Sequence, residues 1–338
     1  MMILLYLIIL IIINISFLFI LSKIAESLKL VDVPNERKIH KGNVPIVGGI
    51  AIYLSLFLLI PFLNQPHWIN LIIYSASTIV ILGALDDALQ IGIVVRLFAQ
   101  IIAASLILGG GLSILDLGEY NYIGSIKIGM FGIFFTLFTV LATVNAFNFI
   151  DGIDGLASSL VLIALSSLYI FGILDGGITD KKIFYLLFIN ILVFFLVNLG
   201  LTPLKKIFLG DAGSMMLGFI TAWLLIYYSH PTVKSIHPVL TLWCITIPAY
   251  DFLGVIIRRI IKNKNIFIPD RMHLHHVLLN KGYSPKYSLI LISVSACFLS
   301  LFGGITYFIF GAFISLITYF ILFCFYILGS YFYITKFK

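Results

Sequence analysis

Long runs of apolar residues, separated by short polar segments, recur along the whole chain. The runs lie at 3–21, 46–63, 69–85, 93–110, 130–149, 155–173, 183–200, 212–229, 238–257, 287–308 and 311–333. Each is close to the ~20 residues that a helix needs to cross a bilayer. The pattern predicts an all-α, polytopic membrane helix bundle of about 11 transmembrane helices, forming a single domain over 1–338. The last two runs meet without a polar turn, so they form either a tight hairpin or one long broken segment.

The composition excludes an ordinary soluble domain. Hydrophobic residues make up 61% of the chain and charged residues only 10%, far from the usual globular average. The first run follows no Lys or Arg and has no small-residue cleavage site. We therefore expect it to be the first membrane helix rather than a removable signal peptide.

The basic residues are divided unevenly between the two sides that the runs define. Segments on one side carry 17 of the 21 Lys and Arg residues. Because basic loops stay in the cytoplasm, we predict an external N-terminus and a cytoplasmic C-terminus. The net charge of +7 follows these short loops and forms no basic patch with interleaved aromatic residues, so no nucleic-acid partner is expected.

Acidic residues lie at the ends of apolar runs, and by this topology all these ends face the cytoplasm. Asp86 and Asp87 end one run, Asp151 and Asp154 follow another, and Asp211 precedes a third. Carboxylates at the edge of hydrocarbon are costly, so they usually mark a site. The adjacent pair also needs a cation or donors to offset its repulsion. The structural alternatives are a solvated loop pair for Asp86 and Asp87 and, for Asp211 taken by itself, a helix N-cap, at which Asp is favoured.

Asparagine side chains accompany these carboxylates. Asn145, Asn148, Asp151 and Asp154 are spaced by three, so neighbours face each other on a helix. The glycines that follow each Asp are expected to unwind the helix end into a loop. Amide and carboxylate oxygens are the hard ligands that Mg²⁺ prefers, and this ion uses few protein ligands. The alternative is polar contacts between helices, with the Asp residues as caps.

Basic and histidine side chains follow the acidic motifs. Arg96 lies on the run after Asp86–Asp87, with Gln100 one turn later, where both can reach toward a phosphate. The loop 258–286 holds three His residues within 273–276, directly after Arg271. Neutral imidazole prefers Zn²⁺ or Cu²⁺ to Mg²⁺. We therefore interpret Arg271 and these His residues as donors to a phosphate or sugar, with a transition-metal site or a solvated basic loop as alternatives.

Two further features are predicted to lie beside this site. The loop 32–49 is either a basic anchor on anionic lipid or, through Gly48 and Gly49 at a helix start, part of a phosphate site. Asp251 lies inside the ninth run but in its cytoplasmic half. We expect it to join the same cluster.

Taken together, five segments resemble the motifs of the polyprenyl-phosphate N-acetylhexosamine-1-phosphate transferase family, which includes the phospho-N-acetylmuramoyl-pentapeptide transferase. They are the loop 32–49, Leu85-Asp86-Asp87, the Asn- and Asp-rich segment 145–156, the Gly-Asp segment 208–214 and the Asp-Arg-Met-His-Leu-His-His segment 270–276. Each is weak alone, but the five occur in family order over most of the chain. The His-Leu-His-His form and the span count resemble the N-acetylglucosamine branch.

The resemblance implies an enzyme of the bacterial cytoplasmic membrane with its active site on the cytoplasmic face. It would transfer N-acetylglucosamine 1-phosphate, or another N-acetylhexosamine 1-phosphate, from a UDP-sugar to undecaprenyl phosphate, releasing UMP in the first membrane step of envelope polysaccharide synthesis. It implies Mg²⁺, or Mn²⁺ in its place. The implied candidates are Asp86, Asp87 and Asp151 for catalysis at the lipid phosphate, Asp211 and Asn148 for the metal, and Lys41, Arg96, Asn145, Asp154, Arg271, His273, His275 and His276 for the nucleotide, phosphates and sugar.

Other functions are weighed against this one. A CDP-alcohol phosphotransferase would place an Arg shortly after Asp-Gly, and the sequence after Asp154 lacks it. A transporter would place charges near the middle of the membrane and show repeats, whereas here the charges lie at one rim. The lipid phosphate is already mostly dianionic at neutral pH, because a phosphate's second pKa is about 6. Asp86 therefore either acts as a base or only positions the phosphate. Whether the protein forms a homodimer is left open.

Overall fold

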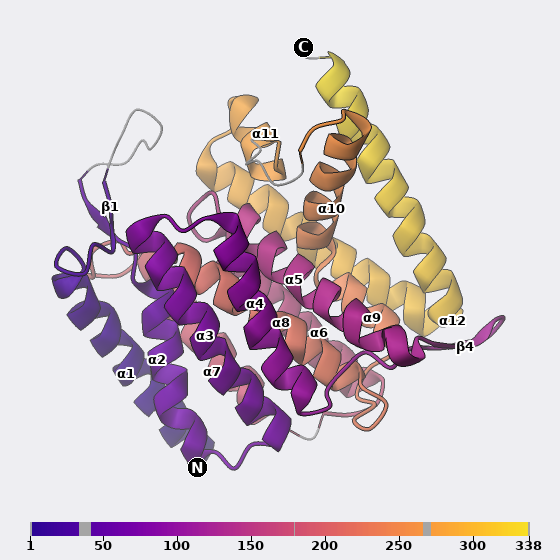
Figure 1. The fold of residues 1–338 in the computed structure, drawn as a ribbon, viewed down its shortest axis with the longest axis horizontal. Helices are drawn as coiled ribbons and strands as arrows, with labels where there is room; N and C mark the ends of the chain where they lie inside the picture. The colour runs from indigo at the N-terminus through magenta and orange to yellow at the C-terminus, as the bar shows by residue number, and fades with distance from the viewer. Residues whose placement is uncertain (1, 34–41, 179, 266–271, 337–338) are drawn as a thin grey trace.

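The computed structural model describes residues 2–33, 42–178, 180–265 and 272–336, which form a bundle of long helices (Figure 1). The prediction of an all-α fold is confirmed. The long helices are α1 (Met2–Ile24), α2 (Gly48–Leu59), α3 (His67–Leu89), α4 (Ile93–Gly109), α5 (Gly132–Ile150), α6 (Leu156–Leu174), α7 (Lys182–Asn198), α8 (Gly210–Ser229), α10 (Thr246–Ile261) and α12 (Pro285–Lys336).

Short elements connect them. They are the helices η1 (Ile60–Phe62), η2 (Gly129–Phe131), α9 (Pro238–Cys244) and α11 (Leu274–Asn280), and two antiparallel pairs, β1 (Val31–Asp32) with β2 (Val44–Pro45) and β3 (Asp116–Tyr120) with β4 (Gly124–Lys127). The N-terminus lies at the end of the bundle opposite to β1, α11 and the C-terminus (Figure 1).

The lengths and apolar composition of these helices identify a multi-pass membrane protein. Within the described residues, six helices are long and apolar enough to cross a membrane, and α9 with α10 would make a seventh span. The apolar helices α2 with η1, α4 and α7 are shorter. The first eight predicted runs each correspond to one helix, with η1 and η2 added at the ends of two. The number of eleven crossings and their orientation stay predictions.

The ninth predicted run differs from the expected single helix. It is divided into α9 and α10, whose axes are bent by 81°. Pro248, in the first turn of α10, has no N–H to donate to the carbonyl of Cys244 four residues earlier, so the helix cannot continue unbroken. The hydroxyl of Thr246 donates to the carbonyls of Leu242 and Trp243 at the break. The bend carries α10 away from the axis of α9.

The last two predicted runs form one helix, α12, with a sharp kink at Gly311. That residue has φ +84° and ψ 172°, a backbone conformation that glycine adopts readily. Two arms therefore meet without a polar turn, 285–310 and 312–336, and Figure 1 shows them diverging from one corner. The second arm packs along α10.

The helix α8 lies at the centre of the bundle, packed against α2, α3 and α5. Small residues bring these helices unusually close. A Cβ atom on Gly49 would lie 2.1 Å from the Cα of Gly213, and one on Gly83 would lie 2.3 Å from the Cα of Ala212. The first turn of α8 is thereby held directly against the end of α3, where the acidic pair lies.

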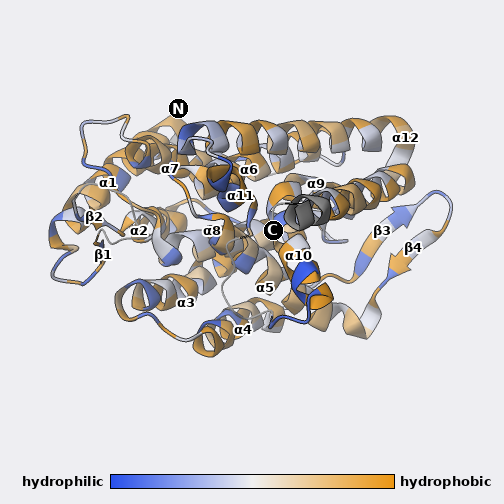
Figure 2. Ribbon diagram, turned by 90° about the horizontal axis from the view of Figure 1, so that it is seen from above, coloured by the Kyte–Doolittle hydropathy of each residue, from blue (hydrophilic) through white to orange (hydrophobic). Residues whose placement is uncertain are grey.

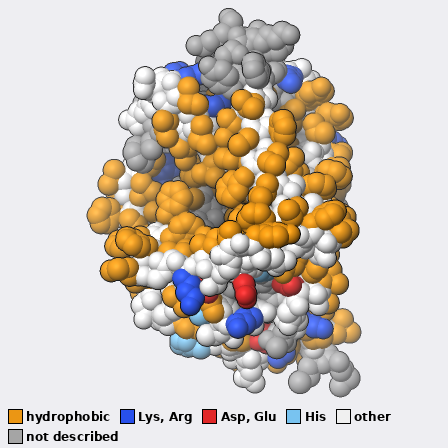
Figure 3. Space-filling model, turned by 90° about the vertical axis from the view of Figure 1, so that its right-hand side faces the viewer, with side chains coloured by type: hydrophobic (Ala, Val, Ile, Leu, Met, Phe, Trp, Pro, Cys, Tyr) orange, Lys and Arg blue, Asp and Glu red, His pale blue; other side chains and the backbone are white. Residues whose placement is uncertain are grey.

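The outer surface carries mostly apolar side chains. The outward faces of the long helices are hydrophobic along most of their length (Figure 2). Seen from the side of α12, orange side chains form a broad belt, and charged and His side chains gather below it (Figure 3). This arrangement fits a bundle surrounded by lipid.

Candidate active site

An ion-paired cluster lies where the end of α3 meets the starts of α4 and α8. The side chain of Asp86, which is buried, places Oδ2 2.8 Å from the guanidinium of Arg96, and its Oδ1 accepts from the backbone N–H of Ile91. The same guanidinium lies 3.7 Å from Oδ2 of Asp211. Arg96 thus joins two of the three acidic motifs and offsets their repulsion.

The second member of the acidic pair, Asp87, has a different partner. Its two carboxylate oxygens accept from the backbone N–H groups of Asp211, at 3.0 Å, and Ala212, at 3.2 Å. The carboxylate therefore satisfies the free N–H groups of the first turn of α8 and complements the helix dipole. Gly210 has φ +76°, and a side chain there would meet Asp87. The N-cap function expected of Asp211 is thus supplied by Asp87.

Asn148 connects the last turn of α5 to the same place. Its Nδ2 donates to Oδ1 of Asp211 at 2.8 Å and to Oγ of Ser214 at 2.9 Å. The hydroxyl of Ser214 in turn donates to the carbonyl of Gly210. The predicted metal pair, Asp211 and Asn148, is therefore brought together.

Asn145 lies one turn deeper and does not reach this cluster through a hydrogen bond. Its Nδ2 donates to Oε1 of Gln100, at 2.9 Å, and to the carbonyl of Leu141. Gln100 is 1% exposed and also contacts the sulfur of Met215. This buried layer lies beneath the acidic cluster, and Gln100, predicted from the sequence to reach toward a phosphate, bonds to Asn145 there instead.

The segment 151–155 links α5 to α6 as a loop, as predicted. Asp154 pairs with Lys206, whose Nζ lies 2.5 Å from Oδ2. Oδ1 of the buried Asn198 accepts from the N–H of Gly155 at 2.6 Å, and its Nδ2 donates to the carbonyl of Ile207. The loop is thus held against the segment 198–209, which connects α7 to α8. Lys206 follows the apolar run 183–200 and Asn198 lies inside it, and neither residue is predicted from the sequence to join the site.

Asp151, the first residue of this loop, lies among other negative charges. Burial raises the pKa of its carboxyl well above the usual range, and the nearby charges of Asp211, Asp87 and Asp154 act in the same direction. A cation bound at this place would relieve that repulsion.

The histidine segment 273–276, at the start of α11, packs against the loop 151–155. Nδ1 of His273 lies 2.8 Å from Oδ2 of Asp251, whose Oδ1 accepts from the N–H of Leu274 at 2.9 Å and from the hydroxyl of Tyr326 at 3.2 Å. The ring of Phe149 lies beside that of His273. Asp251 therefore orients His273 and the start of α11, and its place in the same cluster as the other acidic residues stays a prediction.

His275 has a different environment from His273. It is 1% exposed, and its ring packs against Gly152, where a Cβ atom would lie 2.0 Å from Nε2. Neither ring nitrogen has a hydrogen-bond partner among the described residues. Burial, together with the neighbouring His276 and His273, lowers the pKa of His275 to about 3. The ring is therefore neutral near pH 7 and supports the loop 151–155 from above, while that of His276 lies beside it.

The segment at the start of α2 also borders the site. The N–H groups of Gly48 and Gly49 donate to the carbonyls of Phe208 and Leu209, and Phe208 donates to the carbonyl of Pro45. These glycines therefore allow another backbone segment of the protein to approach closely. Their N–H groups donate to that segment, so they are not free to bind a phosphate. Two predicted substrate contacts, Lys41 and Arg271, lie outside the described residues.

In the described part of the chain, no three His, Cys, Asp or Glu side chains are grouped so that they could hold a metal ion by themselves. The site contains instead a carboxylate and an amide side by side, a guanidinium between two carboxylates, and an Asp–Lys pair on the adjoining loop. Such an arrangement at one end of a membrane helix bundle offers both a cationic donor and oxygen ligands, which is typical of sites that bind phosphates.

Known proteins identify the family. Residues 68–229 match the model of glycosyl transferase family 4. An undecaprenyl-phosphate α-N-acetylglucosaminyl 1-phosphate transferase of Yersinia pestis is 33% identical over 294 residues, 86% of this chain and 80% of that protein. Proteins of the same name from Pasteurella multocida and Escherichia coli K12 are 36% and 31% identical, each over 85% of this chain and over 81% and 79% of their own lengths. The chain belongs to glycosyl transferase family 4.

Proposed function

We propose that this protein transfers N-acetylglucosamine 1-phosphate from UDP-N-acetylglucosamine to undecaprenyl phosphate and releases UMP. The observation that carries the proposal is the convergence of Asp86, Arg96, Asp211 and Asn148, in a chain whose relatives are named for this activity. Two anionic substrates must be held together, and a guanidinium beside oxygen ligands for a cation offers the charges that this requires.

We propose Mg²⁺, or Mn²⁺ in its place, as the cofactor. The side chain of Asp211 is 37% exposed, and the amide oxygen of Asn148 accepts no hydrogen bond from a described residue. Both offer hard oxygen donors, and the lack of a larger ligand cluster fits an ion that binds through one or two carboxylates, waters and substrate phosphates. When bound there, the ion would supply positive charge to the diphosphate and to the departing UMP.

In the proposed reaction, an oxygen of the lipid phosphate attacks the phosphorus that carries the sugar. The bond from that phosphorus to the oxygen shared with UMP breaks, and UMP leaves with the electron pair. Catalysis of this kind is mainly positioning and charge stabilisation. Arg96, held by Asp86, would orient the lipid phosphate, and an oxygen that is already anionic needs no covalent enzyme intermediate.

The remaining side chains are assigned by their places around this centre. Asp154, held by Lys206, would contact the uridine moiety, and His273, held by Asp251, would donate to the sugar or its phosphate. The ring of His275 is buried, and its nitrogens have no hydrogen-bond partner among the described residues, so we assign it to supporting the loop 151–155 rather than to direct contact.

We place this site on the cytoplasmic face, which is supported by the 17 of 21 basic residues expected there. A cysteine introduced at Asn265, at the site end of α10, tests the placement in intact cells. It should resist an impermeant thiol reagent until the membrane is opened. Rapid labelling of intact cells would reverse the orientation.

The activity itself is tested with purified protein, undecaprenyl phosphate and a panel of UDP-sugars, by measuring UMP release. UDP-N-acetylglucosamine should be the preferred donor. A preference for UDP-N-acetylmuramoyl-pentapeptide would overturn the assignment of substrate while keeping the chemistry. Labelled UMP should not enter UDP-N-acetylglucosamine when lipid phosphate and lipid product are absent, and robust exchange there would demand a covalent intermediate.

A further inference from the structure

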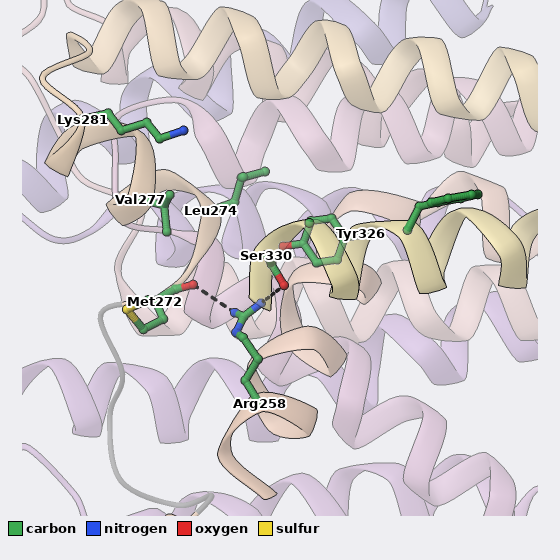
Figure 4. Close-up of a pocket in the computed structure, with 9 residues that line it drawn as sticks. Arg258, Met272, Leu274, Val277, Lys281, Tyr326 and Ser330 are labelled. Carbon is green, nitrogen blue, oxygen red and sulfur yellow. Dashed lines mark hydrogen bonds between the residues drawn. The ribbon is translucent and has the colours of Figure 1, made fainter. Parts of the chain in front are cut away.

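A pocket of about 390 Å³ lies between α10, α11 and the second arm of α12, apart from the acidic cluster (Figure 4). Its lining combines cationic, hydroxyl and apolar side chains. The residues are Arg258, Met272, Leu274, Val277, Lys281, Phe325, Tyr326, Gly329 and Ser330. Two of these residues are cationic, and none of the described lining residues is acidic.

The guanidinium of Arg258 is the buried polar group of this pocket. The residue is 5% exposed, and its nitrogens donate to Oγ of Ser330 at 2.8 Å and to the carbonyl of Met272 at 3.1 Å (Figure 4). Both partners are neutral, and no carboxylate of the described residues forms an ion pair with it. Asp251, two turns earlier on α10, is engaged by α11 and Tyr326. The hydroxyl of Tyr326 interacts with both Arg258 and Asp251, so this carboxylate faces the guanidinium only across that neutral group. A buried cation without a direct counter-charge is costly, which favours an anion at this place.

A second hollow, of about 410 Å³, adjoins the first along the same arm. It is lined by Leu316, Ile317, Phe320, Ile321, Cys324, Phe325 and Leu328, none of them charged. Phe325 lines both hollows. Most of these residues are spaced by three or four, so they share one helix face. From Leu316 to Leu328 the arm rises roughly 18 Å, at about 1.5 Å per residue. That length compares with about 15 Å for the hydrocarbon of one leaflet.

We propose that the two hollows form one binding site for an anionic glycerophospholipid. Its phosphate would lie against Arg258 and Ser330, at the same end of the bundle as the active site, and one acyl chain would follow the apolar hollow past Phe325. The charge complementarity selects an anion, and the length of the apolar face matches a chain that spans one leaflet. In the described structure, no contact joins Arg258 to Asp86, Arg96 or Asp211, so this is a place separate from the reacting phosphates.

Binding is measured by the melting temperature of the purified protein in a neutral detergent with added phosphatidylglycerol or phosphatidylcholine. Phosphatidylglycerol should raise the melting temperature in a saturable manner, and phosphatidylcholine should not. Arg258→Gln should weaken the apparent affinity by about tenfold, as expected for the loss of one hydrogen bond to a charged group. Lys264→Gln, which removes an exposed charge from the end of α10, should keep the response.

A second pair of variants keeps the test valid if Arg258→Gln fails to fold. Ser330→Asp places a carboxylate against Arg258 and should abolish the response to phosphatidylglycerol while the protein stays folded. Ser284→Asp adds the same charge at the N-terminus of α12, outside the pocket, and should leave the response intact.

Three results would overturn the proposal. One is an equal response to both phospholipids, and another is an equal loss in the pocket variants and in their matched controls, which would indicate surface electrostatics alone. The third is displacement of phosphatidylglycerol by undecaprenyl phosphate at equal mole fraction, together with loss of that displacement in Ser330→Asp. This result would make the pocket a substrate site.

Discussion

The carboxylate of Asp87 holds the backbone on which Asp211 is presented, through bonds of 3.0 and 3.2 Å to the first N–H groups of α8. The two acidic residues lie 124 positions apart in the chain. One of them therefore works through the backbone of the other, and the adjacent residues Asp86 and Asp87 have different tasks. Asp86 faces Arg96, and Asp87 fixes the helix that carries the proposed metal ligand.

Asp87→Ala should lower both stability and activity. The variant leaves two N–H groups at the start of α8 without an acceptor, a loss comparable to that of a helix N-cap, about 1–2 kcal/mol. Asp87→Asn keeps one acceptor oxygen, so its melting temperature and activity should lie between those of Asp87→Ala and the wild type. Melting temperature and rate of UMP release are measured in the same detergent. A wild-type melting temperature for Asp87→Ala would show that the cap contributes nothing.

Asp211→Asn should abolish transfer without unfolding the protein. The amide keeps the shape of the carboxylate but removes the negative charge that a hard cation requires, so activity should fall by at least about a hundredfold. Asp180→Asn is the matched control, because Asp180 lies before α7 and outside the site, where its backbone carbonyl accepts from the hydroxyl of Tyr228. Near-wild-type activity at ordinary Mg²⁺ concentration would remove Asp211 from the metal site.

Asp151 makes the effect of metal removal depend on pH. Because burial and neighbouring carboxylates raise its pKa, the metal-free folded protein binds this proton more tightly than the unfolded chain. Stability contributed by the protonated form is therefore present at low pH and is lost as pH rises through the raised pKa. Chelation of divalent metal should lower the melting temperature more at pH 8 than at pH 6.

The variant Asp151→Asn tests the origin of that pH dependence. It removes the titrating group, so the metal-free protein should melt at a higher temperature than the wild type at pH 8, and the difference should shrink at pH 6. An unchanged melting temperature at both pH values would mean that the Asp151 carboxyl is not strained by its neighbours.

Lys206→Ala should weaken nucleotide binding with little change in kcat. The pair that Lys206 forms with Asp154 is partly exposed, and such pairs contribute at most about 1 kcal/mol, so KM for the UDP-sugar should rise by about two- to fivefold. Lys205→Ala removes the neighbouring, exposed charge and serves as the control. Equal effects of the two variants would indicate general attraction of an anion instead of support for Asp154.

Tyr326→Phe should affect the sugar side of the site from a distance. Its hydroxyl donates to Asp251, which holds His273, and the loss of one hydrogen bond corresponds to about a fivefold change. If Tyr326 acts through His273, the double variant with His273→Ala should be no worse than His273→Ala alone in kcat/KM. Additive losses would show that the arm only stabilises the fold.

The sequence predicts the helices well where apolar runs end at charged residues. It fails at positions where one residue changes the course of a helix, as Pro248 does between α9 and α10. Gly311 likewise bends α12, and the sequence offered no way to choose between a hairpin and a broken segment.

The candidate site is predicted to a similar extent. Asp86, Asp211 and Asn148 are recognised because polar groups beside hydrocarbon need a reason. Asn198 and Tyr326 are not, because their partners are distant in the chain and their own surroundings in the sequence are apolar. The functions of Asp86, Asp87, Asp151 and the other predicted residues in catalysis stay predictions.

The close packing that glycines allow between α8 and its neighbouring helices has a consequence for membrane insertion. In α8, 94% of the most apolar stretch is buried by protein, against 17% in α1, and α8 is the least apolar of the six long spans. A nascent α8 therefore gains little from lipid and much from Gly49 and Gly83 on helices synthesised before it. Chains interrupted before α8 hold Asp87 and Asn148 without their partners in the first turn of α8. Insertion of this one helix thus brings together the centre of the bundle and the acidic cluster in a single step of assembly.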